Sequence, residues 1–322
     1  MGKFVNPFTD IGFKVIFGSE PSKDMLIFFL NGLLEGEYEV TDLTFLDKED
    51  HGGNVNDRGI VYDIYCRTSD GKYIIVEMQN RWHSHFLDRT LYYVCRGISR
   101  QNGQNAYPKS LGDDRCRDYG KRYDLSAVYG IFLMNFKEEG LEPKFRSDTT
   151  IIDRDTGKAI NTHFRQIYLQ FPFFTKELHE CGTLFEKWLY TLKNMDKWNR
   201  MPDALKEQVF QRLAQLAEVA NLSEDNRIAY DKALDYYYID ETVRYDEYMR
   251  AEKAKKDMEE TLAKGRKEGL EKGRKEGMEE GRKEGMEEGI RKVAIQMLKE
   301  GLTSDVISQC TGLTAAEIAT LN

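Results

Sequence analysis

The segment IVYDIYCRTSDGKYIIVEMQ, residues 60–79, constrains this chain more than any other, because it predicts two β-strands joined by a tight turn. Both ends of the segment are rich in Val, Ile and Tyr, and Ser69-Asp70-Gly71 between them is a strong turn signal. Glu77 and Gln79 lie two residues apart in the second strand and therefore point to the same face. The sequence thus predicts a β-hairpin with polar side chains on one face.

The length of the turn decides whether Asp63 joins that face. A three-residue loop with Gly71 in the left-handed conformation pairs Asp63 with Glu77, and directly opposed residues share a face. A two-residue Asp-Gly turn would pair Asp63 with Met78 and send it to the other face. Two carboxylates and an amide together suit a hard divalent cation and an attacking water. Taken alone, an Asp and a Glu in a hairpin more often form a wetted face without function. The opposite face is predicted to be mostly apolar and to pack on helices: Tyr62, Ile64, Cys66, Ile74, Val76 and Met78.

These residues resemble the catalytic motif of the PD-(D/E)XK nuclease superfamily, and more closely that of its transposase-like branch, the Rpn family of recombination-promoting nucleases. In that branch a glutamine replaces the superfamily's lysine, and Asp63, Glu77 and Gln79 match the resulting pattern. The resemblance covers nearly the whole chain. Its other segments are the start NPFTDIGFKVIFGSE with Asp10, Phe13, Lys14 and Phe17, the Arg89 and Tyr93 pair, EKWLYTLKNM, the Gly-Arg-Lys-Glu-Gly repeats and the closing EGLTSDVISQCTGLTAAEIATLN.

Two segments depart from the family's pattern. The family often has a lysine before the catalytic aspartate, where this chain has Asp57-Arg58-Gly59. Residues 99–122 are longer and more irregular than the usual connection, so the role of that loop stays open.

The hydrophobic pattern agrees with the resemblance, which implies an α/β fold with a restriction-endonuclease-like αβββαβ core and a helical C-terminal extension. Apolar periodicity predicts the following elements: helices in residues 1–36, a strand at 38–46, the hairpin, a helix at 83–98, and strands at 126–136 and 162–171 with a third near 149–152. On the 83–98 helix, an apolar stripe is predicted to face the core: Leu87, Leu91, Val94 and Ile98. We expect residues 1–180 to form the nuclease-like core and residues 181–263 a helical module.

Two further segments follow that module. From Gly265 to Gly289, glycine occupies every fourth position. Because each glycine costs a helix about 0.8 to 1 kcal/mol relative to alanine, residues 264–290 are predicted to form a solvated, fraying tether. A close glycine seam between two helices of a dimer is the alternative. Residues 291–322 have a helix-turn-helix-like outline that would hold DNA or a partner, or act as a small helical cap or an oligomerisation element.

The resemblance implies a Mg²⁺-dependent DNA endonuclease, with Mn²⁺ or Ca²⁺ as alternative ions. Asp63, Glu77 and the Met78 carbonyl would hold the ion, which would polarise the scissile phosphate and lower the pKa of a bound water. Gln79 could orient that water but could not deprotonate it. The further candidates are Arg89, which would bind phosphate or brace a carboxylate, Arg96 as a second phosphate ligand, and Asp10 as an additional acid. The alternative is a catalytically inactive DNA-binding or assembly protein on a nuclease scaffold.

Composition narrows the setting in which such a protein would act. The chain has 322 residues, of which 40% are hydrophobic and 32% charged, enough for one substantial core with helical appendages. No apolar run approaches the roughly 18 to 20 residues that cross a bilayer, and the start does not resemble a signal peptide. Five scattered cysteines suggest neither disulfides nor a zinc site. We therefore expect a cytoplasmic protein without a membrane partner.

Charge is distributed unevenly along the chain. The formal net charge of −8 argues against a protein that coats nucleic acid through bulk electrostatics. Residues 81–122, however, carry nine Lys or Arg against four Asp, a local net charge of +5. This basic segment could contact phosphates, although an ordinary solvated helix and loop would have the same composition.

Overall fold

The computed structural model describes residues 2–50, 59–104 and 125–321, and the chain divides into two compact units, Met1–Thr242 and Val243–Asn322. The strands are β1 Leu43–Phe45, β2 Glu49–Asp50, β3 Ile60–Val61, β4 Ile64–Thr68, β5 Tyr73–Gln79, β6 Val128–Met134, β7 Arg146–Ile152 and β8 Ala159–Gln170. The helices are α1 Asp10–Phe17, α2 Lys23–Leu33, α3 Phe86–Gln104, α5 Leu184–Asn194, α6 Gln208–Leu216, α7 Glu224–Lys299, α8 Ser304–Thr311 and α9 Ala315–Ala319.

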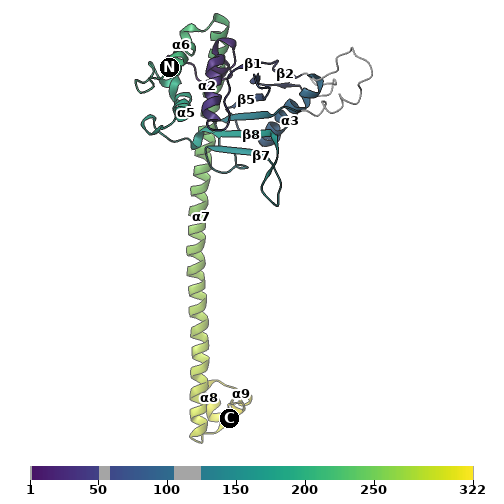
Figure 1. The fold of residues 1–322 in the computed structure, drawn as a ribbon. Coiled ribbons are helices and arrows are strands. Elements are labelled where there is room, and N and C mark those ends of the chain that lie inside the picture. The colour runs from purple at the N-terminus through teal and green to yellow at the C-terminus, as the bar shows by residue number, and fades with distance from the viewer. Residues whose placement is uncertain (1, 51–58, 105–124, 322) are drawn as a thin grey trace, which may run out of the picture. The chain divides into compact units, whose positions relative to one another are not determined.

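The first unit is built on a six-stranded mixed sheet with the order β1-β4-β5-β6-β8-β7 (Figure 1). β5 pairs with β6 and β6 with β8 in parallel, whereas the remaining pairs are antiparallel. Parallel neighbours need a long crossover connection, and the connection from β5 to β6 contains α3. The central strand β6, VYGIFLM, is almost continuously apolar, as expected for a strand covered on both faces. β2 and β3 form a separate two-stranded sheet.

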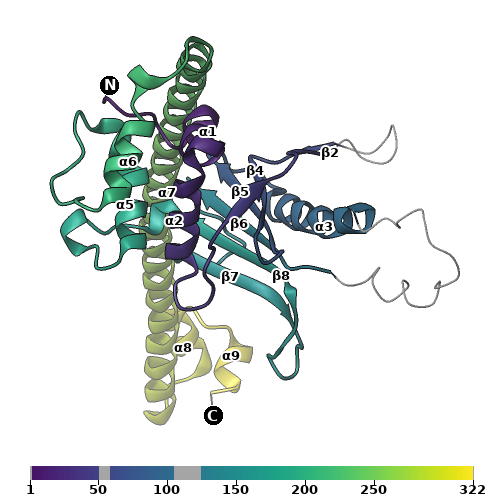
Figure 2. The same ribbon diagram turned by 45° about the horizontal axis from the view of Figure 1, so that its top comes forward.

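Two hydrophobic cores cover the two faces of this sheet (Figure 2). On one face, α1, α2, α5 and α6 pack through residues such as Phe17, Phe29 and Trp188 against strand residues that include Val76 and Leu133. On the other face, α3 packs through Phe86 and Val94 against the strands. Helices α5 and α6 therefore share a core with the sheet, and the boundary that we place between residues 180 and 181 remains a prediction.

Two glycines lie in the contact between helix α3 and the sheet, one on each element, and each is surrounded closely by side chains. A Cβ at Gly130 of β6 would lie 2.6 Å from Val94 Cγ2, and a Cβ at Gly97 of α3 would lie 3.1 Å from Ile75 Cδ1. A side chain at either position would require these neighbours to shift. The two glycines thus contribute to the close packing of α3 on the sheet.

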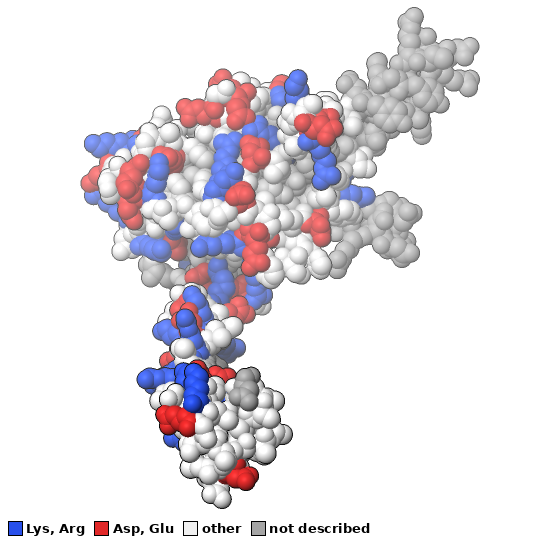
Figure 3. Space-filling view, turned by 90° about the horizontal axis from the view of Figure 1, so that it is seen from below, with Lys and Arg blue, Asp and Glu red and all other residues white. Residues whose placement is uncertain are grey.

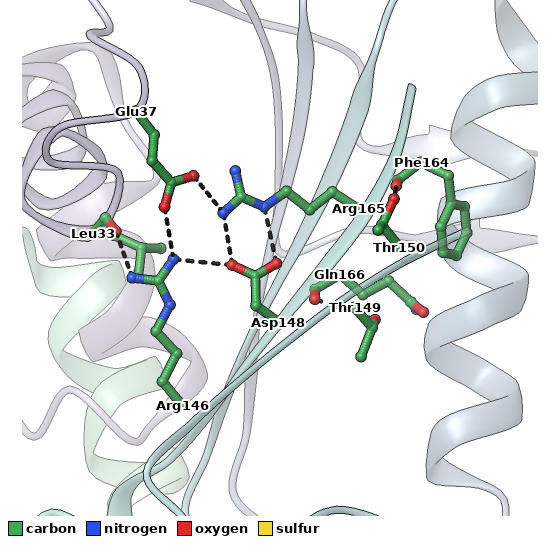
Figure 4. Close-up of polar contacts among 9 residues, drawn as sticks. All are labelled: Leu33, Glu37, Arg146, Asp148, Thr149, Thr150, Phe164, Arg165 and Gln166. Carbon is green, nitrogen blue, oxygen red and sulfur yellow. Dashed lines mark hydrogen bonds and ion pairs between the residues drawn. The ribbon is translucent and has the colours of Figure 1, made fainter. Parts of the chain in front are cut away.

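At the edge of the sheet, a charged cluster ties β7 and β8 to the end of α2 (Figure 4). Arg165 contacts Glu37 at 2.7 Å and Asp148 at 2.6 Å, and Arg146 contacts Asp148 at 3.0 Å. Arg146 also donates to the Leu33 carbonyl at 3.0 Å. We call Glu37, Arg146, Asp148 and Arg165 the edge network. It places two arginines against two carboxylates, so the charges balance within the fold.

The predicted α/β class and element order are confirmed, and the differences are local. The strand expected over residues 38–46 is limited to β1, and the third strand expected near residues 149–152 is β7. The prediction that Leu91 lies in the core is wrong, because this side chain is 47% exposed. The buried face of α3 instead includes the polar side chains of Thr90 and Gln101.

The second unit consists of the later part of α7 followed by α8 and α9. A Cβ at any glycine from Gly265 to Gly289 would meet no atom within 4 Å among the described residues, and this stretch is exposed throughout. The segment is therefore a solvated part of the continuous helix α7. Its predicted fraying and its role as a tether stay predictions, as does the glycine seam between two copies. Ala294, Ile307 and Ile318 form a small core of their own.

Candidate active site

The hairpin of β4 and β5 has the three-residue loop that the carboxylate arrangement requires. Thr68 N donates to Lys72 O at 2.8 Å, Gly71 N donates to Thr68 O at 2.9 Å, and Gly71 has a φ of +97°. The ladder continues through the pairing of Ile64 with Val76. Counting one step further brings Asp63 level with Glu77. The prediction of an odd-numbered loop is therefore confirmed.

Asp63 and Glu77 are bound to each other's strands by reciprocal hydrogen bonds. The backbone N–H of Asp63 donates to Glu77 Oε1 at 3.0 Å, and the backbone N–H of Met78 donates to Asp63 Oδ2 at 2.9 Å. Glu77 is only 1% exposed, and Asp63 is partly buried. The two carboxylates thus lie together at the end of the hairpin, and we refer to them as the acid pair.

Tyr62, the residue before Asp63, breaks the alternation of side chains between the two faces of the sheet. Tyr62 was predicted to share a face with Ile64 and Val76, but it packs in the core under α3 together with Tyr65. The physical reason is that the strand is interrupted at Tyr62 and Asp63, between β3 and β4. Strict period-two alternation holds only within a continuous strand. The interruption frees the Asp63 N–H from the strand ladder to donate to Glu77.

Burial and mutual repulsion both oppose ionisation of the acid pair. Burial raises the pKa of Glu77 well above its usual range, and the charge of Asp63 acts in the same direction. Burial also raises the pKa of Asp63, although the hydrogen bond from the Met78 N–H partly offsets this effect. Carboxylates with raised pKa values that share one site are typical of functional sites, because structural carboxylates usually find compensating charge.

Gln79 and Arg89 extend the acid pair into a short polar chain. Gln79 Nε2 donates to Glu77 Oε2 at 3.4 Å, and Arg89 donates from Nη1 to Gln79 Oε1 at 3.4 Å. Arg89 Nη2 lies 3.8 Å from Glu77 Oε2, and its guanidinium sits 4.9 Å from the centre of the Tyr93 ring. Of the two roles considered for Arg89, this geometry favours bracing a carboxylate. Tyr93, one helical turn along α3, supports the arginine.

Asp10, Lys14 and Lys48 interact with Asp63 through their charges. Asp10 begins α1 and pairs with Lys14 at 2.8 Å, and the charges of both residues act on the pKa of Asp63 in opposite directions. Lys48 is the residue that sequence reasoning missed. Burial, followed by the positive charge of Lys14, lowers the pKa of Lys48, while the charges of Asp63 and Asp10 oppose this shift. No motif marked Lys48, which lies in the short connection between β1 and β2.

The remaining candidates are placed less directly. Arg96 is partly exposed on α3, seven residues after Arg89 and therefore on nearly the same face of the helix. Asp57-Arg58 and residues 105–124, which include five cations of the basic segment, lie outside the described residues. Among the described residues, no group of three or more His, Cys, Asp or Glu side chains could hold a metal ion. The acid pair provides two such ligands.

The comparisons with known proteins agree with this geometry. A mixed sheet with an acid pair at the end of its second hairpin strand is typical of a PD-(D/E)XK nuclease-like core. The model of the PD-(D/E)XK nuclease family transposase matches residues 7–247, so the chain belongs to that family. The model of the Rpn/YhgA-like nuclease family C-terminal HTH domain matches residues 287–322. No curated protein and no solved structure gave a significant match.

Proposed function

We propose that the protein is a divalent-metal-dependent DNA endonuclease that hydrolyses phosphodiester bonds in the cytoplasm during DNA recombination or the movement of mobile elements. The observation that carries this proposal is the acid pair. Two carboxylates with raised pKa values meet across a hairpin in a chain of the PD-(D/E)XK family. Members of that family generally are phosphodiesterases, and among the described residues no helix is long and apolar enough to cross a membrane.

The donor set fits a hard divalent cation. Mg²⁺ is usually held by one or two carboxylates and keeps several water ligands, so Asp63, Glu77 and the Met78 carbonyl would suffice. Mn²⁺ and Ca²⁺ prefer the same oxygen donors. A cation would also relieve the repulsion that raises the pKa of Glu77. When bound, it would supply Lewis-acid polarisation of the phosphate and a water of lowered pKa.

The side chains next to the acid pair would mainly orient the water and the carboxylates rather than take up protons. Gln79 has no titratable group, so its amide can hold a water by hydrogen bonding but cannot take its proton. Arg89 holds Gln79 and Glu77 in place, which keeps the carboxylate fixed while substrate enters. Arg96 and Asp10 would extend the site, the first toward phosphate and the second as an additional acid.

Local rather than global charge would attract DNA. On the face shown in Figure 3, Lys and Arg side chains are interspersed with Asp and Glu. The formal net charge of −8 likewise provides no overall attraction to DNA. We therefore expect modest, salt-sensitive affinity that depends on a few phosphate contacts near the acid pair.

The test is nicking of supercoiled plasmid by purified full-length protein with Mg²⁺, Mn²⁺ or Ca²⁺. Cleavage should require a divalent ion, and Asp63→Ala and Glu77→Ala should abolish it while circular dichroism shows an intact fold. Full residual cleavage by both variants would refute the assignment. A variant of the exposed repeat, Glu268→Gln, is the matched control and should cut normally.

A second candidate function is a DNA-binding or assembly protein in which the nuclease fold is only a scaffold. The match to an HTH domain favours it, because a helix-turn-helix commonly places a helix in the major groove. The same C-terminal helices could join copies into a homo-oligomer. Calorimetric titration with Mn²⁺ separates the candidates, since a scaffold should show no binding that depends on Asp63.

A further inference from the structure

A hollow of about 440 Å³ lies between α1, the connection that carries Lys48 and the start of α7. Its two lysines interact with Asp63 of the acid pair through their charges. Its size is within the range of ordinary ligand sites. Lys14 and Lys48 line it together with uncharged residues, and none of its described lining residues is Asp or Glu. The remaining lining residues are Ile11, Val15, Gly18, Ser19, Pro21, Leu216, Asn221, Leu222, Ser223 and Asn226.

The charges of this hollow do not balance within the described part of the chain. Lys14 is paired with Asp10. For Lys48, no described carboxylate lies within ion-pair distance, and the residue is only partly exposed. Two cations confined near each other repel, and taking an amine from water without a partner costs free energy. An anion in the hollow would remove both costs.

Hydrogen bonds from two neighbouring elements hold the backbone at Lys48 and on either side of it. Lys48 O accepts a hydrogen bond from the Tyr62 N–H at 3.0 Å, which fastens the connection next to Asp63. Arg100 of α3 donates to Asp47 O at 3.3 Å and to Glu49 O at 3.4 Å. Two elements that flank the candidate active site thus fix the position from which Lys48 extends.

We propose that Lys14 and Lys48 form a phosphate-binding subsite that receives the DNA backbone next to the phosphodiester held at the acid pair. This inference rests on the proposed nuclease function and names the side chains that hold the strand. A lysine binds phosphate as a point charge and tolerates several geometries, which suits a backbone contact without sequence preference. In this arrangement Lys48 places a cation beside the acid pair, where Gln79 supplies none.

The experiment measures the affinity of the full-length protein for a fluorescently labelled DNA duplex in EDTA at increasing KCl. Lys48→Gln should weaken binding and reduce the slope of log K against log salt by about 1, and Lys14→Gln with Lys48→Gln by about 2. Lys48→Arg should keep the wild-type slope. Lys23→Gln is the matched control, because Lys23 pairs with Asp42 outside the hollow at 2.7 Å, and it should change nothing.

Calorimetry with Mn²⁺ separates this inference from the proposed function. Lys48→Gln should bind the ion as the wild type does, whereas Asp63→Asn should not. An unchanged salt slope in Lys48→Gln and in Lys14→Gln, with metal binding and cleavage intact, would overturn the subsite and leave the nuclease assignment standing. A wild-type protein that binds no metal would overturn the nuclease assignment, while the salt slope would still decide the subsite. If Lys48→Gln fails to fold, Lys14→Gln alone carries the test.

Discussion

Two carboxylate clusters of the sheet, the edge network and the acid pair, differ in how their charge is compensated. In the edge network, Asp148 accepts hydrogen bonds from Arg165 and Arg146 that lower its pKa although burial opposes this shift. In the acid pair, Arg89 is the described cation within ion-pair distance of Glu77, at 3.8 Å, and the pKa of Glu77 is raised. The edge network neutralises itself, whereas burial and mutual repulsion outweigh the effect of Arg89 on the acid pair, so an external cation is its natural partner. Burial of a carboxylate alone therefore does not mark a functional site; uncompensated burial does.

The largest expected effect distinguishes the two clusters by activity. Asp63→Asn and Glu77→Gln should each lower the rate of Mg²⁺-dependent plasmid nicking by about 10³-fold, because losing a charged ligand removes several kcal/mol of transition-state stabilisation. Asp148→Asn should cut at the wild-type rate. A comparable loss in Asp148→Asn would show that the edge network also serves catalysis and would break the comparison.

Metal affinity should depend steeply on pH. Protons compete with the ion for the acid pair, so Mn²⁺ affinity should rise with pH by up to about tenfold per pH unit for each proton displaced. The rise should begin in the ordinary carboxyl range and continue until the pH exceeds the raised pKa values of the two acids. Calorimetry across a series of buffers, from the ordinary carboxyl range to mildly alkaline pH, would measure it. A flat profile would show that the acid pair is already ionised without metal.

The same pKa directions give opposite contributions to stability. A raised carboxyl pKa favours the protonated folded state, so the acid pair of the metal-free protein should destabilise the fold progressively as pH rises through the raised values. The lowered pKa of Asp148 contributes stability above its ordinary pKa, and this stability should be lost as pH falls through the lowered value. Thermal unfolding of Asp63→Asn and Asp148→Asn across pH would separate the two contributions.

Replacement of Arg89, which braces Glu77 and Gln79, should have a moderate effect on the rate of nicking. Arg89→Ala should lower nicking by about tenfold, because Glu77 and Gln79 lose a charge-assisted contact worth about 1.4 kcal/mol. The positive charge of Arg89 also lowers the pKa values of both acids, so the pH profile of metal binding should move upward. Arg89→Lys, which keeps the charge but not the fork, should restore the profile more than the rate. Identical behaviour of the two variants would refute the bracing role.

The smallest effect concerns the edge network itself. Asp148→Asn should destabilise the fold by only about 1 kcal/mol, because ion pairs that remain partly exposed contribute little. Urea unfolding of metal-free protein would measure it, with Asp63→Asn expected to be no less stable than the wild type. A large loss of stability in Asp63→Asn would mean that the acid pair is structural.

The sequence predicted the hairpin and the shared face of Glu77 and Gln79, because turn residues and a period of two determine them. It left the register open between two loop lengths, and the meeting of Asp63 with Glu77 followed only once the loop had three residues. It misplaced Tyr62, since the break in the strand depends on tertiary hydrogen bonds rather than on local pattern. It also did not identify Lys48, whose importance comes from what surrounds it in space. Leu91 shows the converse error, because an apolar residue at helical spacing need not be covered.

The packing of α3 on the sheet at Gly97 and Gly130 also affects which related sequences are expected to be active. A single methyl group at position 130 would lie 2.6 Å from Val94 Cγ2 of α3 and 2.8 Å from the Phe132 ring of β6, so these neighbours would have to shift. We expect Gly130→Ala to weaken the packing of α3, which carries Arg89, although every polar residue of the motif is kept. A related sequence with an intact Asp, Glu and Gln but a larger residue at this position is therefore expected to have lower activity.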